Sequence, residues 1–424
     1  MEIAIIIVFI VGYIAITLEH NIHLNKAASA LMTGVLCWTL YILGQEDHHL
    51  VTHELMEHLG EISGILFFLL GAMTIVELID AHEGFQVIKE GIKTRDARKL
   101  LWLVGIFTFF LSAILDNLTT TIVIVSLLRK IISDKEQRLF FAGITVIAAN
   151  AGGAWSPLGD VTTTMLWIGG QVSAGHIVTQ LILPSIVCLV VPLIILSFRM
   201  KGVLQSPEEP EINPSSSNFE RNLVLGLGVG ALLFVPIFKT LTHLPPFMAM
   251  LMGLGIMWAI TELIHSKKDT EDKKPLSVAY ALQKIDTPSI LFFLGILISI
   301  SALQSTGQLR QLADWLTATI QNDSLIVMTI GLLSSVVDNV PLVAAAQGMY
   351  TLEQYPTDHF FWVFLAYATG TGGSALIIGS AAGVAAMGME KIEFFWYLKR
   401  ISWLAVAGYF AGAGVYLLQN SLIH

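Results

Sequence analysis

The stretch Asp116-Asn117-Leu118-Thr119-Thr120-Thr121 interrupts an apolar region that runs from residue 100 to residue 132. The apolar arms on its two sides have about fifteen residues each, and at about 1.5 Å per residue neither crosses about 30 Å of hydrocarbon. The stretch Asp338-Asn339-Val340-Pro341 divides the region 324–350 in the same way, and its proline ends the first arm. Both regions therefore predict re-entrant helical hairpins.

Two further apolar regions, 139–173 and 359–388, are interrupted by glycine-rich stretches. The first contains Asn150-Ala-Gly-Gly-Ala-Trp-Ser-Pro-Leu-Gly-Asp160, and the second contains Thr369-Gly-Thr-Gly-Gly-Ser374. Non-helical backbone at membrane depth persists only inside protein or beside a water-filled cavity. Each region predicts a broken crossing helix, and glycines 152, 153, 372 and 373 are interpreted as the residues that open the backbone.

The composition is that of an integral membrane protein. Of 424 residues, 54% are hydrophobic and only 13% are charged, and the net charge is −9. These values exclude a soluble enzyme, a secreted disulfide scaffold and a nucleic-acid binder. The sequence predicts further spans at 2–18, 26–44, 62–80, 177–198, 222–240, 247–265, 288–304 and 401–419.

The basic residues predict an orientation. If each hairpin returns to its own side and both termini lie outside, every Lys and Arg falls in cytoplasmic loops, Lys26 among them, except Lys239 and Arg310. Cytoplasmic loops of membrane proteins carry such an excess of positive charge. Treating either hairpin as a full crossing would scramble this distribution.

The chain repeats itself at an offset of about 220 residues. Glu61 to Leu69 resembles Asp286 to Leu294 at an offset of 225, and Asp116-Asn117 matches Asp338-Asn339 at 222. Five predicted crossings separate the hairpins, so the two halves have opposite orientations. Inverted repeats with broken helices are typical of secondary transporters, with the site near the bilayer midplane. The predicted organisation is scaffold helices at 1–60, a first repeat at 61–198, a cytoplasmic linker at 199–221, scaffold helices at 222–285 and a second repeat at 286–424.

Three carboxylates, Asp116, Asp160 and Asp338, lie inside the interrupted motifs, and no Lys or Arg is predicted at the same depth. A buried, unpaired carboxylate costs several kcal/mol unless a proton or a cation neutralises it. Because desolvation lets a proton and a small hard cation compete for the same oxygens, the pattern indicates antiport. The structural alternative for Asp116 and Asp338 is helix N-capping.

Neutral oxygen donors surround these acids, and together they could form a sodium-sized cage. They are Asn117, Asn150, Thr119, Thr120, Thr121, Ser156, Thr162, Thr163, Thr164, Asn339, Thr369, Thr371, Ser374 and Ser380. Each hydroxyl could equally bond to its own helix backbone. Position 160 is matched at an offset of 220 by Ser380, so the principal cation site is predicted in the first repeat.

Glu61 and Asp286 precede the two matching apolar runs and are secondary candidates for an ionic role. Their structural alternative is interfacial helix capping. The segment from His48 to His58 is predicted as an outer solvated loop, with a pH-sensing or cation-gathering role as the alternative.

Taken together, these motifs resemble the NhaD-type sodium/proton antiporters of the ion transporter superfamily, along nearly the whole chain. The resemblance implies an all-α fold with paired re-entrant hairpins and broken helices, commonly as a homodimer. It implies a multi-pass protein of the bacterial inner membrane that exports Na⁺, and usually Li⁺, in exchange for H⁺, without a cofactor. The site residues that it implies are Asp116, Asn117, Asn150, Asp160, Thr162, Thr163, Asp338, Asn339 and Ser374, with Na⁺ held at Asp116, Asn117, Asn150 and Asp160.

Two other functions are alternatives to sodium/proton exchange. A transporter of dicarboxylate or arsenite in the same architecture would hold its anion at hairpin tips and helix N-termini, but three acids without a basic partner disfavour it. An intramembrane hydrolase is disfavoured because the sequence has no HExxH or GxSxG motif and Ser374 lacks an obvious intramembrane histidine.

Overall fold

The computed structural model describes residues 2–17, 19–86, 94–200, 202–204, 217–266, 269, 273–336 and 338–423. Within these ranges the backbone is helical except for connections, and the sole β-type pairing is an isolated bridge between Asp96 and Val203. Seven of the described helices are long and apolar enough to cross a membrane, or up to nine if each bent pair is one span. The all-α polytopic fold is confirmed. Most of the predicted linker, residues 205–216, lies outside the described ranges, as do Lys89, Lys93, Lys201, Lys267 and Lys268.

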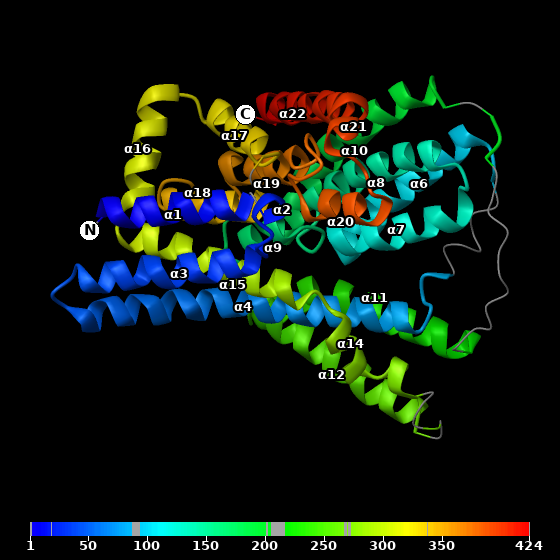
Figure 1. The fold of residues 1–424 in the computed structure, drawn as a ribbon, viewed down its shortest axis with the longest axis horizontal. Coiled ribbons are helices and arrows are strands. Elements are labelled where there is room, and N and C mark those ends of the chain that lie inside the picture. Colours follow the sequence, from blue (N-terminus) through cyan, green and yellow to red (C-terminus); the bar gives the residue numbers. More distant parts are fainter. Residues whose placement is uncertain are drawn as a thin grey trace.

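The long helices lie roughly along the longest axis of the molecule (Figure 1). Most predicted spans coincide with a helix to within a few residues. The helices of the first half are α1 (Glu2–Thr17), α2 (Glu19–Ile22), α3 (Lys26–Leu43), α4 (His48–Ala81), α6 (Ala97–Leu115), α7 (Asn117–Ile131), α8 (Lys135–Ala154), α9 (Val161–Ile168) and α10 (Ala174–Ser197). Those that follow are α11 (Asn218–Thr242), α12 (Pro246–Ile264), η1 (Lys274–Leu276), α14 (Val278–Lys284), α15 (Thr287–Ser305), α16 (Gln308–Ile320), α17 (Asp323–Leu333), α18 (Asn339–Met349), α19 (Phe360–Gly372), α20 (Ala381–Glu390), α21 (Phe394–Arg400) and α22 (Ser402–Ile423).

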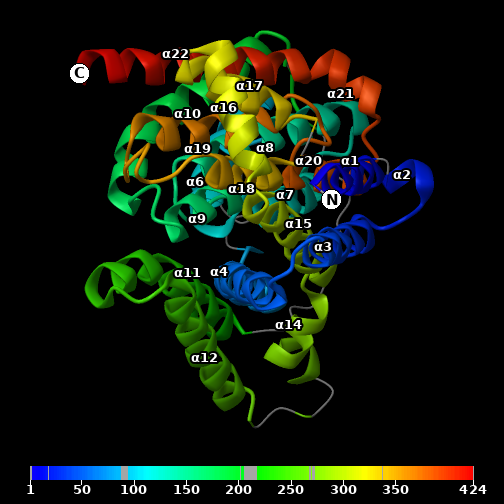
Figure 2. The same ribbon diagram turned by 90° about the vertical axis from the view of Figure 1, so that its left-hand side faces the viewer.

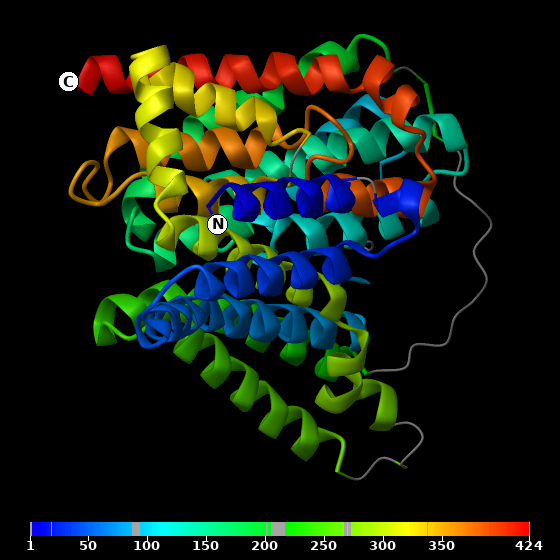
Figure 3. The same cartoon turned by 60° about the vertical axis from the view of Figure 1, so that its left-hand side comes forward.

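Two elements differ from the prediction. The segment His48–His58 is not a loop but the first turns of α4, whose 34 residues begin after the N-cap Asp47. The helix α16 was not predicted, because its sequence mixes apolar residues with Gln308, Arg310 and Asp314 and is only 13 residues long. It is bent by 119° relative to α17 and crosses the long helices, as Figure 3 shows.

The two interrupted regions with Asp-Asn motifs form helical hairpins, α6 with α7 and α17 with α18. Figure 1 shows them toward opposite ends of the long axis. The predicted arm length is wrong for the first arm, because α6 has 19 residues and is by itself long enough to cross a membrane. The arms α17 and α18 have 11 residues each, which is short of a crossing.

The broken helices are interrupted later in the chain than predicted. The helix α8 continues through Asn150 to Ala154, and the non-helical segment is 155–160. Likewise α19 continues to Gly372, and 373–380 is the non-helical segment that precedes α20. Asn150 therefore lies on a helix, which fixes the direction of its side chain.

The glycines of these motifs allow close packing. The prediction that they open the backbone is wrong for Gly152, Gly153 and Gly372, which are helical, whereas Gly373 is the first residue of the non-helical segment. A Cβ atom on Gly152 would lie 2.1 Å from the carbonyl oxygen of Phe109, and one on Gly372 would lie 2.0 Å from that of Gly331. Neither glycine has a positive φ. Small residues let membrane helices approach closely, so Gly152 joins α8 to the first hairpin as Gly372 joins α19 to the second.

The two repeats exchange contacts around the centre of the molecule. The helix α20 packs against α7, α9 packs against α18, and α10 packs against α22. Each broken helix thus lies against the hairpin of the other repeat. Figure 2 shows α4, α11 and α12 together on one side of this assembly, where α12 packs against α4.

Candidate cation site

Asp160 lies at the point where the broken helix resumes as α9. Its side chain is 1% exposed. Its Oδ1 accepts hydrogen bonds from the backbone N–H and the hydroxyl of Thr162, at 3.0 and 2.9 Å. Asn117 Nδ2 donates to Oδ2 at 2.7 Å, and Asn339 Nδ2 lies 3.4 Å from both carboxylate oxygens. The tips of both hairpins therefore meet at one carboxylate, and each of these donors is neutral.

Asn150 connects this carboxylate to the second repeat. Its Oδ1 accepts from Asn117 Nδ2 at 3.1 Å, and its Nδ2 donates to the hydroxyls of Ser374 and Ser380 at 2.9 Å each. All of these side chains are buried. Seven of the predicted site residues thus form one hydrogen-bonded network across the two repeats: Asn117, Asn150, Asp160, Thr162, Asn339, Ser374 and Ser380.

Asp116 forms the tip of the first hairpin in a strained conformation. Its φ is 126°, which non-glycine residues rarely adopt. Its carboxylate accepts from the backbone N–H of Thr119 at 2.7 Å and from the Thr119 hydroxyl at 2.9 Å. Asp116 therefore caps α7, as the structural alternative predicted, and it also interacts electrostatically with Asp160.

Asp338 differs from the other two acids because it has a basic neighbour. Lys26 Nζ lies 3.8 Å from Asp338 Oδ2, and this ammonium also lies 4.6 Å from the centre of the Phe292 ring. The prediction that no Lys or Arg lies near the acids is wrong here. Lys26, predicted in a cytoplasmic loop, is instead the first residue of α3. No local sequence pattern indicates this contact, because Lys26 and Asp338 are far apart in the chain.

The hydroxyls separate into three groups. Thr119 and Thr162 donate to the acids, as described. Ser156 donates to the carbonyl of Ala113 at 2.5 Å and Thr371 to that of Tyr367 at 2.6 Å, so both satisfy backbone groups. Thr120, Thr121 and Thr163 are buried, and their hydroxyl oxygens have no hydrogen-bond partner within the described part of the chain. A buried hydroxyl without a partner is costly, so Thr120 and Thr163 remain candidates for cation coordination.

The secondary candidates lie away from this network. Glu61 is in the middle of α4 and so cannot cap it; its side chain is 75% exposed and 3.8 Å from the His58 ring. Asp286 is the N-cap of α15 and accepts from the backbone of Ser289, which agrees with interfacial capping. Among the residues that the structure describes, no group of three or more His, Cys, Asp or Glu side chains could hold a metal ion. The histidines of α4 therefore form no such group.

A cavity of about 50 Å³ joins two of the acids. Asp116, Asn117, Asp338 and Lys26 line it, together with Thr164. The helices α7, α9, α18 and α20 all begin here, capped by Asp116, Asp160, Asp338 and Ser380. The arrangement offers carboxylate, amide and hydroxyl oxygens, which are the ligands that hard cations prefer.

Comparison with known proteins gives a consistent assignment. Residues 4–370 match the sequence profile of the CitMHS family, described as "Citrate transporter". Sodium/proton antiporter 1 of Arabidopsis thaliana is 49% identical over 424 residues, covering 99% of this chain and 73% of that protein. The Na(+)/H(+) antiporter NhaD of Vibrio cholerae is 31% identical over 447 residues, covering 98% of this chain and 91% of that protein. NhaD of Alkalimonas amylolytica is 28% identical, covering 98% of this chain and 90% of its own length.

The relatives match along nearly the whole chain, including the hairpins, the broken helices and the site residues of both repeats, whereas the family profile ends before Ser374 and Ser380. All of these matches are transporters and not enzymes. The chain belongs to the CitMHS family of the ion transporter superfamily and, within it, to the NhaD-type sodium/proton antiporters.

Proposed function

We propose that this protein exchanges Na⁺ for H⁺ by competition of the two ions at Asp160 and Asp116. The observation that carries the proposal is the burial of Asp160 among donors that are all neutral. A carboxylate in that position needs a proton or a cation as its counter-charge. The names of the relatives at 49% and 31% identity support Na⁺ as that cation.

The exchange follows from mutually exclusive occupancy. When Asp160 and Asp116 are protonated, a cation gains little by approaching them. When the protons leave to one side, the same oxygens, with Asn117 and Asn150, could hold Na⁺. Loss of the bound ion on the opposite side completes the cycle once the two repeats change their relative arrangement. Raising the pH removes the competing proton, so the apparent affinity for Na⁺ rises with pH.

An anion substrate fits the site less well, although the family description names citrate. Helix N-termini are anion-binding positions, and four of them meet at the centre of the molecule. Side chains of this chain already occupy them, since Asp116, Asp160 and Asp338 cap three of the four helices. A free dicarboxylate would therefore meet three carboxylates.

The test is a proteoliposome assay of the purified full chain. A pH gradient is set, and Na⁺, Li⁺, K⁺ or citrate is added separately. We expect Na⁺ and Li⁺ to dissipate the gradient and citrate with an impermeant cation to leave it intact. Dissipation by citrate alone would overturn the proposal in favour of anion transport.

The matched variants are Asp160→Asn and Asp314→Asn. Asp160→Asn is expected to abolish Na⁺-dependent dissipation, because the neutral amide can bind neither ion as a counter-charge. Asp314 is exposed on α16 and is not part of the hydrogen-bonded network, so Asp314→Asn should exchange as the parent does. Full activity of Asp160→Asn would remove Asp160 from the mechanism.

The setting in the cell is part of the same proposal. A multi-pass membrane transporter agrees with the apolar helices and with relatives from both plants and bacteria. We propose the bacterial inner membrane, both termini outside, and a homodimer as the functional unit. Fusing a periplasm-active reporter to the C-terminus tests the orientation.

A further inference from the structure

Three cavities follow one another from the surface to the acids. A cavity of about 430 Å³ and one of about 140 Å³ share Asp80, Phe85, Ile122 and Val123 as lining residues. The smaller of these also shares Met73 and Leu118 with the central cavity of about 50 Å³, which Asp116 and Asp338 line. We name the two outer cavities together the acidic vestibule. It opens at the end of the molecule where α7 ends in Arg129 and Lys130.

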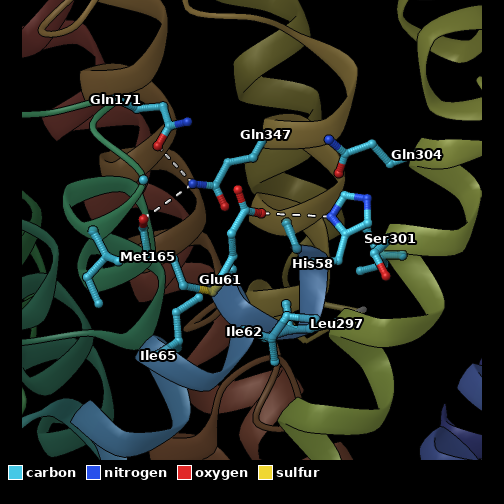
Figure 4. Close-up of a pocket in the computed structure, with 14 residues that line it drawn as sticks. His58, Glu61, Ile62, Ile65, Met165, Gln171, Leu297, Ser301, Gln304 and Gln347 are labelled. Atoms are coloured by element: carbon cyan, nitrogen blue, oxygen red, sulfur yellow. Dashed lines mark hydrogen bonds and ion pairs between the residues drawn. The ribbon is translucent and has the colours of Figure 1, made fainter. Parts of the chain in front are cut away.

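A cavity at the opposite end is its counterpart in the other repeat. This cavity of about 410 Å³ lies between α4, α9, α15 and α18 (Figure 4). Its lining residues Glu61, Ser301 and Ala344 are matched by Asp286, Val76 and Ile122, at offsets of 225 and 222. We name it the polar vestibule.

The polar vestibule is separated from the acids. None of its described lining residues also lines the central cavity. Gln347 Nε2, on α18, donates to the carbonyl of Met165, on α9, at 3.3 Å and contacts the Gln171 side chain at 2.9 Å (Figure 4). These bonds hold α18 against α9 in the wall of the polar vestibule. Among the described residues, shared lining therefore links the central cavity to the acidic vestibule and not to the polar vestibule.

The vestibules also differ in charge. Glu77 and Asp80 line the acidic vestibule, and the residues that match them at an offset of 225 are Ala302 and Ser305. Glu83 and Asp286 add to the acids of the acidic vestibule, against Lys130 and Lys284. Among its described lining residues, the polar vestibule has one acid, Glu61, and the others are His58, three glutamines, a serine, a glycine and apolar residues. Clefts lined by one sign of charge concentrate ions of the other sign.

We propose that Asp80 and Glu77 form the cation path that leads through the acidic vestibule to Asp116. Asp80 lies where the two outer cavities join, and Glu77 lies further in. The proposal rests on the proposed exchange of Na⁺ for H⁺. It adds a consequence, namely that cation uptake is more efficient from the acidic vestibule than from the polar one.

The first test measures access without requiring transport. Ile122→Cys and Ala344→Cys are matched by the repeat and line the acidic and polar vestibules, respectively. Each is made in a chain with Cys37→Ala and Cys188→Ala, and a membrane-impermeant thiol reagent is added to one face of oriented vesicles at a time. We expect Ile122→Cys to react from one face only and Ala344→Cys from the other. Reaction of both from the same face, or no reaction of Ile122→Cys, would overturn the proposal.

The second test separates binding from turnover. For Asp80→Asn and Glu77→Gln we expect the apparent KM for Na⁺ on the acidic-vestibule face to rise about three- to tenfold, with less than about a twofold change in maximal rate. Asp80→Glu, which keeps the negative charge, should have the same apparent KM for Na⁺ as the parent protein. The control is Glu136→Gln, an exposed acid at the same end outside the cavities.

A fall in maximal rate at unchanged KM, or an equal shift in the control, would show that these acids are structural and would overturn the path. If the parent protein shows no Na⁺-dependent exchange, the proposed function fails, whereas the thiol experiment still decides whether the acidic vestibule is open to its own face of the membrane.

Discussion

Asn117 carries one of the shortest bonds of the site, 2.7 Å to Asp160 Oδ2. A hydrogen bond to a charged group contributes about 1.5–3 kcal/mol. Asn117→Ala should therefore raise the apparent KM for Na⁺ about tenfold or more, because the carboxylate loses the donor that orients it. The measurement is Na⁺-dependent dissipation of a pH gradient across a range of Na⁺ concentrations. Asn218→Ala, an exposed asparagine at the start of α11, is the control, and an equal KM in both variants would contradict this role.

Asp338 and Asp160 should respond differently to the same substitution. Lys26 lies beside Asp338, and both side chains are partly exposed, at 26% and 20%. Because Lys26 already supplies a counter-charge, Asp338→Asn should keep measurable exchange with a KM raised less than about tenfold, as expected for a partly exposed pair. Complete loss of exchange in Asp338→Asn, in a protein that still elutes as a single species, would place Asp338 with Asp160 as an ion-binding acid.

The helix bounds show what the sequence could predict about the elements. Interruptions by polar residues were enough to place the hairpins and the broken helices, because an aspartate at membrane depth is energetically costly and therefore rare. The exact ends of α8 and α19 were not predictable, since glycine signals either an open backbone or a close contact, and here Gly152 contacts the backbone of α6. The amphipathic α16 gave no span signal at all.

This close contact makes a prediction at the scale of the helix pair. Gly152→Ala places a methyl group 2.1 Å from the Phe109 carbonyl oxygen, so α6 and α8 must separate. Overpacking of this kind costs about 1–3 kcal/mol, and the unfolding temperature in detergent should fall. Gly230→Ala on α11 is the control, because nothing lies within 4 Å of its added Cβ. A fall of equal size in both variants would contradict the packing role.

At the scale of the whole molecule, Glu390 ties the repeats together. It is 3% exposed and accepts from Arg129 Nε at 2.7 Å and from Arg138 Nε at 2.8 Å. The two arginines belong to the first repeat and Glu390 to the second, so no local pattern could have predicted this cluster. The same is true of the bonds from Asn150 to Ser374 and Ser380, which join residues more than 220 positions apart.

Removing the charge of Glu390 should loosen the junction between the repeats. Glu390→Gln leaves two arginines without a counter-charge, which costs about 3–5 kcal/mol when both partners are buried. Arg129 is 46% exposed, so water reduces this cost, and we expect about 2 kcal/mol. The measurement is the urea midpoint in detergent, with the exposed Glu393→Gln as the control. Equal midpoints for the two variants would show that the cluster does not stabilise the protein.

Each broken helix packs against the hairpin of the other repeat, and this arrangement has a consequence for biosynthesis. A nascent chain that has been made only as far as α10 already contains Asp160, yet Asn339, Ser374 and Glu390 have not been synthesised. Until α18 to α20 are inserted, Asp160 and the two arginines have only lipid headgroups, water or the first repeat itself as neighbours. Completion of the ion site is then among the last steps of assembly, and a truncated product carries no finished conduit that could leak ions across the host membrane.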